Sequence, residues 1–292
     1  MNDVKREMIE RAERLNEMLK DEEFGIDVRD CFKNNGIITT YILKSESRTA
    51  APTIRQEEVM KYSDDEELIR FLIKVYEEYK IDNLDIKKVM SRENILKNVK
   101  PKLISESNLE DVKKSRIVYT KYLDMLVLYY VSVEELSGYE LSASYTLKEE
   151  NINALNISVE ELHKVAVKNI EENYFIRNME EVISEIIGMP INEITEEAEP
   201  DVPMFVISSM NKINGASTIL SKKILDKVAE CLQGDYYIIP SSIHECIAVP
   251  ADITEPDELR SMVQEVNDSQ VEPEERLTYS IYGYVGGKLQ II

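Results

Sequence analysis

The chain of 292 residues contains no tryptophan, only nine glycines and nine prolines, three cysteines and two histidines. So little glycine and proline excludes a collagen-like or low-complexity chain. The hydrophobic fraction of 43% is too high for a disordered chain. A chain of this length can bury roughly three quarters of its unfolded surface, in one large core or two smaller ones.

The few cysteines and histidines limit the metal chemistry that the chain can support. Cys31, Cys231 and Cys246 form no C-x-x-C pair, which disfavours a disulfide framework and a cysteine zinc site. A site with two histidines would have to join His163 and His244, which lie far apart in the sequence. We therefore expect no metal site and no cofactor. Scattered free cysteines are typical of a reducing cytoplasm.

Long hydrophobic runs are also missing. The first residues, MNDVKREMIERAERL, mix both charge signs with apolar residues, whereas a signal peptide needs a continuous apolar stretch. The longest apolar run, Met125 to Val131, is far shorter than the roughly 20 residues that cross a bilayer. The sequence predicts a cytoplasmic protein without a membrane span.

Basic residues are scarce in the second half of the chain. The totals are 35 basic and 56 acidic residues, a net charge of −21. Residues 1–130 hold 24 basic and 26 acidic residues, and residues 131–292 hold 11 and 30. Such an acidic surface repels phosphate groups, so we expect no direct nucleic-acid binding by the C-terminal half. The acidity serves either solubility or a face that attracts the basic surface of another protein.

The second interpretation assigns a set of carboxylates to the binding face. They lie in a proline-rich acidic stretch at residues 190–203 and near residue 274. The set is Glu193, Glu196, Glu197, Glu199, Asp201, Glu272, Glu274 and Glu275.

Common catalytic motifs are missing, namely the P-loop, the G-x-G-x-x-G loop and the G-x-S-x-G elbow. One cluster, Ser241 to Cys246, suggests chemistry. On a strand, Ser242, His244 and Cys246 would share one side, and a hydroxyl or thiol beside an imidazole is the starting point of nucleophilic catalysis. However, serine and histidine two apart on a strand lie side by side, and no orienting carboxylate or oxyanion hole can be assigned.

Turn chemistry also explains this cluster, because proline followed by two serines suits a tight turn. We therefore interpret the cluster as structural, and we name no catalytic residue. The alternative is a hydrolase that uses His244 with Ser241, Ser242 or Cys246. His163, beside Leu162 on a predicted helix, is interpreted as a half-buried structural residue.

Periodicity predicts the secondary structure of the first half. Asp124 to Val133 is almost wholly apolar, which indicates a central strand covered on both faces, with 141–147 paired antiparallel to it. Ser158 and Glu161 form an S-x-x-E capping box that begins a helix. The other predicted elements are helices over 4–19, 64–79, 83–101 and 178–186, and a strand over 36–43 after an Asn-Asn-Gly turn.

The last third alternates strands and helices. We expect a hairpin whose strands are 204–210 and 216–220, a helix capped by Ser221, and a helix with Pro256 in its first turn. Further strands are expected over 236–240, 243–249, 279–285 and 288–292. The predicted class is α+β, with a helix-rich region 1–120 and an acidic region 121–292 that holds a mostly antiparallel sheet with helices packed on it. The two regions are alternatively one continuous body.

Three segments carry a resemblance to a known family. They are Asp235 to Pro250 (DYYIIPSSIHECIAVP), Met262 to Asn267 (MVQEVN) and Glu274 to Leu277 (EERL). They resemble an uncharacterised bacterial family of unknown function from anaerobic Gram-positive bacteria, whose members carry Leu-Pro-Ser-Ser-Ile-His-Glu and then Met-Val-x-Glu-Val-Asn. Ile239 stands here in place of the leucine. The resemblance implies a bacterial or mobile-element intracellular protein, and it implies no activity or catalytic residue.

The leading hypothesis is a non-enzymatic interaction protein. Its acidic C-terminal half would bind the basic surface of another protein, as a regulator or an inhibitor of a nucleic-acid-handling system such as a defence nuclease.

Overall fold

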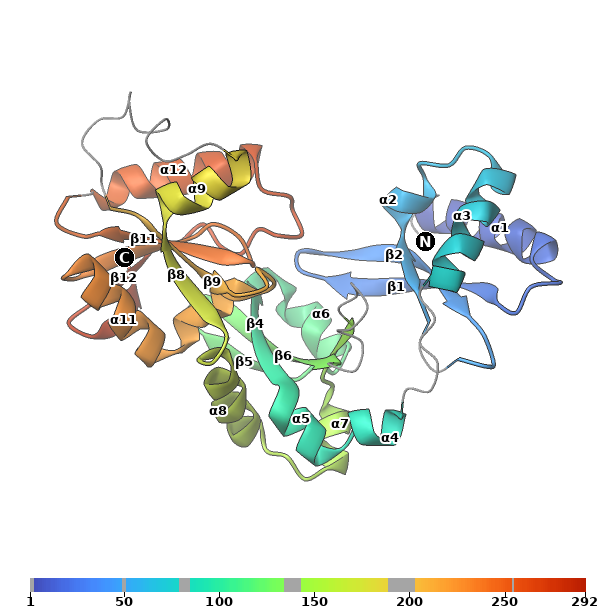
Figure 1. Cartoon of the computed structure of the whole chain (residues 1–292), viewed down its shortest axis with the longest axis horizontal. Helices are drawn as coiled ribbons and strands as arrows, with labels where there is room; N and C mark the ends of the chain where they lie inside the picture. Colours follow the sequence, from blue (N-terminus) through green and yellow to red (C-terminus); the bar gives the residue numbers. More distant parts are fainter. Residues whose placement is uncertain (1–2, 49–50, 79–84, 134–142, 189–202, 254) are drawn as a thin grey trace.

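A computed structural model describes residues 3–48, 51–78, 85–133, 143–188, 203–253 and 255–292. The N-terminal part is a three-stranded antiparallel sheet, order β1-β2-β3, with helices on one face. The long β1–β2 hairpin extends from it toward the rest of the molecule (Figure 1). Its elements are α1 (Asp3–Met18), β1 (Gly25–Lys33), β2 (Gly36–Lys44), β3 (Thr53–Arg55), α2 (Gln56–Val59) and α3 (Asp65–Glu78).

The central part is built around β6 (Met125–Val133), which pairs with all three other strands of its sheet. Both faces of β6 are buried, as its apolar sequence predicted. β7 (Ala143–Thr146) pairs with it antiparallel, which was also expected. The remaining elements are α4 (Ile86–Val89), α5 (Arg92–Asn98), β4 (Val99–Ser105), η1 (Glu106–Asn108), α6 (Leu109–Lys114), β5 (Tyr119–Tyr122), α7 (Glu149–Ala154) and α8 (Val159–Ile170).

The C-terminal part is a six-stranded antiparallel sheet, order β13-β12-β10-β11-β9-β8. Leu259 and Val263 of α12 pack on one face of this sheet, and α11 packs on the other. The elements are β8 (Tyr174–Asn178), α9 (Met179–Ile187), β9 (Phe205–Ser209), η4 (Gly215–Leu220), α11 (Lys222–Leu232), β10 (Tyr236–Pro240), β11 (Glu245–Pro250), α12 (Pro256–Ser269), β12 (Tyr282–Val285) and β13 (Lys288–Ile291). The α+β class and the antiparallel C-terminal sheet are confirmed.

The buried cores divide the molecule. One cluster joins α1, α3 and the N-terminal sheet, from Met8 to Tyr76. The largest cluster runs from Ile95 to Tyr284 and packs the central sheet against the C-terminal sheet. The separation between these cores therefore lies between Tyr76 and Ile95, and the predicted boundary at residues 120 and 121 falls within β5.

Several helices begin where local signals in the sequence predicted. The Ser158 hydroxyl accepts a hydrogen bond from the Glu161 N–H at the start of α8, and Ser221 does the same for Ile224 at the start of α11. Pro256 is the first residue of α12, where its missing N–H costs no hydrogen bond. These three signals were reliable because each acts within one helical turn.

Two of the predicted elements were wrong in type. Residues 216–220 form the 3₁₀ helix η4 and not the second strand of a hairpin. The predicted helix over 83–101 is two short helices, and the chain enters β4 at Val99. Pro101 lies inside β4, an edge strand of the central sheet as far as the structure describes it, where a missing N–H is tolerated. Among the described helices, none is long and apolar enough to cross a membrane.

Candidate functional site

His244 lies in the connection between β10 and β11, one residue before the strand begins. The prediction that Ser242, His244 and Cys246 share one side of a strand is therefore wrong. The Nδ1 atom of His244 accepts a hydrogen bond from the backbone N–H of Asn214 over 3.2 Å. The Nε2 atom lies 3.6 Å from the Glu275 carboxylate. The imidazole thus links the start of η4 to the C-terminal segment, residues 270–281 between α12 and β12.

The candidate nucleophiles are directed elsewhere. The Ser242 hydroxyl accepts a hydrogen bond from the His244 backbone N–H, an arrangement typical of a serine turn. The Cys246 side chain is fully buried, and its Sγ atom lies 3.9 Å from the Ala216 carbonyl oxygen. Burial raises the pKa of this thiol and so suppresses the nucleophilic thiolate. Among the described residues, Ser241 included, no hydroxyl or thiol is hydrogen-bonded to the imidazole, so this geometry gives the hydrolase alternative no support.

The lack of a side chain at Gly215 allows η4 to pack closely against the Ser208 and His244 backbone. A Cβ atom on this residue would lie 2.1 Å from the Ser208 hydroxyl and 2.4 Å from the His244 carbonyl oxygen. Asn214, with φ of 54°, directs the chain into η4 through the left-handed region. The positive φ expected of the Asn-Gly pair is found at Asn214, but the pair introduces a 3₁₀ turn packed against β9 and β11 and not the predicted hairpin.

The acidic candidates have different surroundings. Glu193, Glu196, Glu197, Glu199 and Asp201 lie outside the described residues. Glu274 forms an ion pair with Arg55 of the N-terminal sheet, and Glu275 faces His244. Glu272 is exposed. Two of the three described candidates therefore make contacts within the chain.

An asparagine junction, formed by Asn34, Asn35 and Asn108, holds the tip of the β1–β2 hairpin. The Asn34 side chain donates to the Glu274 and Arg276 carbonyl oxygens over 3.1 and 2.7 Å. The amide of Asn108 donates to both Asn34 and Asn35, and its carbonyl oxygen accepts from the Asn35 N–H. The hairpin tip is thereby bound to both η1 and the C-terminal segment.

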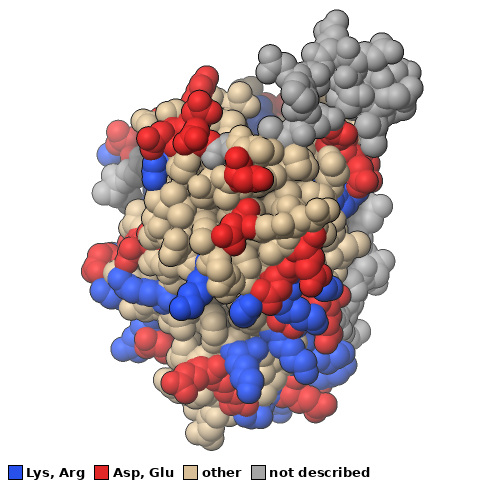
Figure 2. Space-filling model, turned by 90° about the vertical axis from the view of Figure 1, so that its left-hand side faces the viewer, with Lys and Arg blue, Asp and Glu red and all other residues tan. Residues whose placement is uncertain are grey.

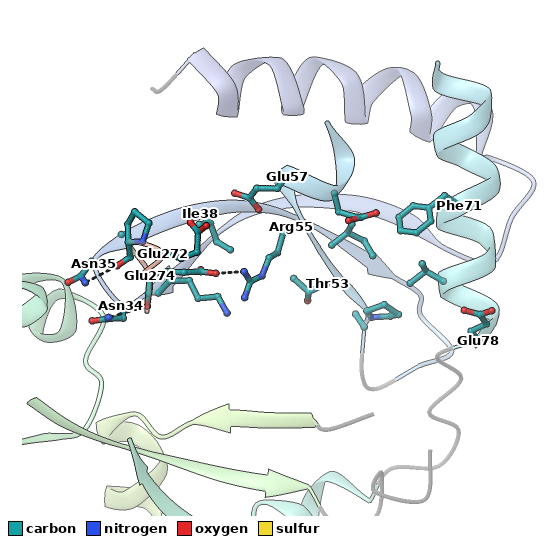
Figure 3. A pocket seen from close by; sticks show the side chains of 18 of the residues that line it. Asn34, Asn35, Ile38, Thr53, Arg55, Glu57, Phe71, Glu78, Glu272 and Glu274 are labelled. Carbon is teal, nitrogen blue, oxygen red and sulfur yellow. Dashed lines mark hydrogen bonds and ion pairs between the residues drawn. The ribbon is translucent and has the colours of Figure 1, made fainter. Parts of the chain in front are cut away.

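A cleft of about 1130 Å³ lies beside this junction. Figure 3 shows Thr53 and Arg55 on β3, Phe71 and Glu78 on α3, and Glu272 and Glu274 on the segment opposite. Arg55 points across the cleft to Glu274. The cleft thus combines apolar side chains with charges of both signs, and sequence reasoning missed it because its two walls come from opposite ends of the chain.

Metal binding is not indicated by these groups. In the part of the chain that the structure describes, no three His, Cys, Asp or Glu side chains gather in a way that could hold a metal ion.

The comparison with known proteins agrees with one part of the resemblance, membership in a family of unknown function. Residues 6–285 match DUF5688, a family of unknown function. The chain belongs to this family. The match covers the His244 connection, the asparagine junction and both walls of the cleft. No curated protein and no solved structure matches the chain.

Proposed function

We propose that this DUF5688 protein is a non-enzymatic binding protein whose acidic C-terminal half contacts the basic surface of another protein. The partner would belong to a nucleic-acid-handling system, such as a defence nuclease, which the protein regulates or inhibits. A bacterial or mobile-element origin, implied by the resemblance of the 235–250 and 262–267 segments, is part of the same proposal.

The charge around α12 carries this proposal. Residues 251–275 contain nine carboxylates and a single basic residue, Arg260, which is paired with Asp257. Within the described residues, no cation contacts Asp252, Glu255, Glu258, Glu265 or Glu272. Figure 2 shows this end of the molecule, with carboxylates prevailing on its upper part and Lys and Arg gathering lower down.

The outer face of α12 has the pattern of a protein-binding helix. Leu259 and Val263 face the sheet, so Glu258, Met262 and Glu265 point outward. The Met262 side chain is 43% exposed between the two carboxylates. An exposed apolar residue flanked by charges resembles the core and rim of a protein interface. An anionic surface also favours a basic partner and speeds its association.

The test compares two variants of the full chain in capture from a lysate of the source cells. The first is E258Q/E265Q/D268N with M262S. The second, a matched control, neutralises Glu13, Glu17 and Glu67 and changes Met18, which is exposed on α1. We expect the unmodified chain and the control to capture one basic protein at low salt, with release in about 0.5 M salt because exposed charges are screened.

The first variant should lose this protein. Mass spectrometry then identifies the captured protein and tests whether it is a nuclease or another nucleic-acid-handling protein. Capture that is unaffected by salt and by the α12 variant would contradict the proposal, and so would the absence of any specific basic partner.

A further inference from the structure

In the structure as described, the outer edge of β3 presents the Thr53 N–H and C=O and the Arg55 N–H without a hydrogen-bond partner. The Leu43 N–H donates to the Pro52 carbonyl oxygen over 2.9 Å, which sets the hydrogen-bonding pattern between β2 and β3. Because bonded pairs alternate along an antiparallel ladder, Ile54 exchanges hydrogen bonds with Tyr41. Thr53 and Arg55 therefore direct their N–H and C=O groups away from β2, where the Arg55 carbonyl oxygen, at the N-cap of α2, accepts the first helical hydrogen bond.

This edge opens into the cleft. β3 is the last strand of its sheet in the part of the chain that the structure describes. Thr53 and Arg55 are exposed and line the cleft, whereas Ile54 is buried in the N-terminal core. Open edges usually carry charges that block pairing. Here the Arg55 guanidinium is drawn aside to Glu274 (Figure 3).

The remaining lining suits an extended, basic peptide. Phe71 and Val75 of α3 offer apolar contact next to the edge. Lys74 pairs with Glu78 over 3.6 Å, and Glu58 pairs with Lys61. In the described part of the cleft, the carboxylates of Glu57 and Glu272 contact no cation, and Lys33 contacts no carboxylate. The lining charges without a partner are therefore negative on balance. The cleft offers them next to one open strand edge.

We propose that the cleft binds an extended polypeptide segment, which adds a strand to β3 and places Lys or Arg side chains near Glu57 and Glu272. Main-chain hydrogen bonds supply affinity in such strand addition, and side-chain pockets supply specificity. The site goes beyond the proposed function, because its edge belongs to the N-terminal sheet and does not involve α12. Variants of α12 therefore test the proposed function, and variants of β3 test this proposal.

The binding experiment uses three fluorescent hexapeptide probes with blocked ends and the full chain, measured by anisotropy. The probes are alternating Lys-Val, alternating Glu-Val, and Lys-Val methylated at every peptide nitrogen. We expect the Lys-Val probe to bind at least about tenfold more tightly than the other two, because these lack the complementary charge or the N–H donors. Equal binding of the three probes, or no binding of the Lys-Val probe, would overturn the proposal.

Substitutions then locate the site. T53P removes an outward N–H that has no partner among the described residues, and proline is tolerated on an edge strand. T53A keeps that N–H and serves as its control. We expect T53P to weaken Lys-Val binding by roughly tenfold relative to T53A. E57Q and E272Q should each weaken binding about two- to fivefold, and E46Q, outside the cleft, should leave it unchanged.

A circular dichroism spectrum checks that T53P folds. If it does not, the N-methylated probe tests the same hydrogen bonds on the unmodified chain. Equal affinity of folded T53P and T53A would overturn strand addition. The edge could instead be occupied by a second copy of the chain, which sedimentation of the protein alone would detect. A dimer that is dissociated by T53P would assign the edge to self-association and contradict the proposal.

Discussion

The side chain of Asn34 donates a hydrogen bond to the backbone carbonyl oxygen of Arg276 over 2.7 Å, although the two residues stand near opposite ends of the sequence. The amide oxygen of the same side chain accepts hydrogen bonds from the Ser105 N–H and from the Asn108 amide. Asn34 is buried, so its amide group depends on these partners rather than on water. One side chain thus joins the N-terminal hairpin, the central sheet and the C-terminal segment.

Replacing Asn34 should destabilise the protein. N34A removes the side-chain partner of the Ser105 N–H and of the Glu274 carbonyl oxygen, and we expect it to lower the free energy of unfolding by about 2–4 kcal/mol. N34D keeps an acceptor but turns a buried carboxylate oxygen toward the Glu274 and Arg276 carbonyl oxygens, so its loss should be at least as large. Urea unfolding measures both. N153A, on the exposed face of α7, is the control, and an N34A stability equal to that of N153A would show that the junction contributes nothing.

Gly215 should tolerate no side chain. The Cβ of alanine would meet the backbone N–H group of Ser209 at 2.5 Å and the Ser208 hydroxyl closer still. Because backbone atoms cannot move aside cheaply, G215A should cost about 3 kcal/mol in urea unfolding. At Gly234 an added Cβ meets nothing within 4 Å, so G234A is the matched control. Similar stability of the two variants would refute the close packing of η4 against the His244 connection.

The three cysteines should differ in reactivity. Cys231 is exposed, Cys31 is half-buried with its Sγ atom 3.3 Å from the Thr40 hydroxyl, and Cys246 is buried. Burial raises the pKa of the Cys246 thiol, so little thiolate is available to react. With a disulfide reagent at pH 8, we expect a fast phase from Cys231, a slower one from Cys31, and reaction of Cys246 only after unfolding. C231S should remove the fast phase. If C246A removed the fast phase and C231S did not, Cys246 would again be a candidate nucleophile.

Sequence reasoning succeeded where the signal lies within the element itself. The apolar run of β6 has no polar alternation, so a strand covered on both faces was predictable. β1 was missed because charged residues at Asp27, Arg29 and Asp30 interrupt its apolar pattern. They are accommodated on an edge strand with partners such as Lys44 and Lys5, which no pattern in the strand itself reveals.

The candidate sites depended on contacts that sequence spacing cannot show. The Asn34-Asn35-Gly36 signal gave the turn correctly, and Asn35 has a φ of 60°. Its amides, however, bind residues more than 200 positions away. The Ser241 to Cys246 cluster looked reactive from adjacency alone, but the preceding turn rotates His244 toward Asn214 and leaves Cys246 in the core.

Asp124 should give the protein a stability that depends on acid pH. Burial alone would raise the pKa of Asp124, but the hydroxyl groups of Tyr282, Ser280 and Thr278 donate hydrogen bonds to its carboxylate and hold the pKa below the usual 3.8. The folded protein therefore binds this proton less readily than the unfolded chain does. The contribution is complete above about pH 5, and it falls as the pH drops through about 4 toward the folded pKa.

Comparison of D124N with the unmodified chain isolates this contribution. We expect D124N to be less stable by about 1–2 kcal/mol at pH 7, a value reduced by the partial exposure of the carboxylate. The difference should shrink between pH 5 and pH 3, because protonation weakens the same hydrogen bonds in the unmodified chain. D252N, which changes an exposed carboxylate without a cation partner in the described structure, should show no such trend. A D124N difference that stays constant down to pH 3 would mean that the ionised carboxylate does not hold the 278–282 segment against the β5–β6 turn.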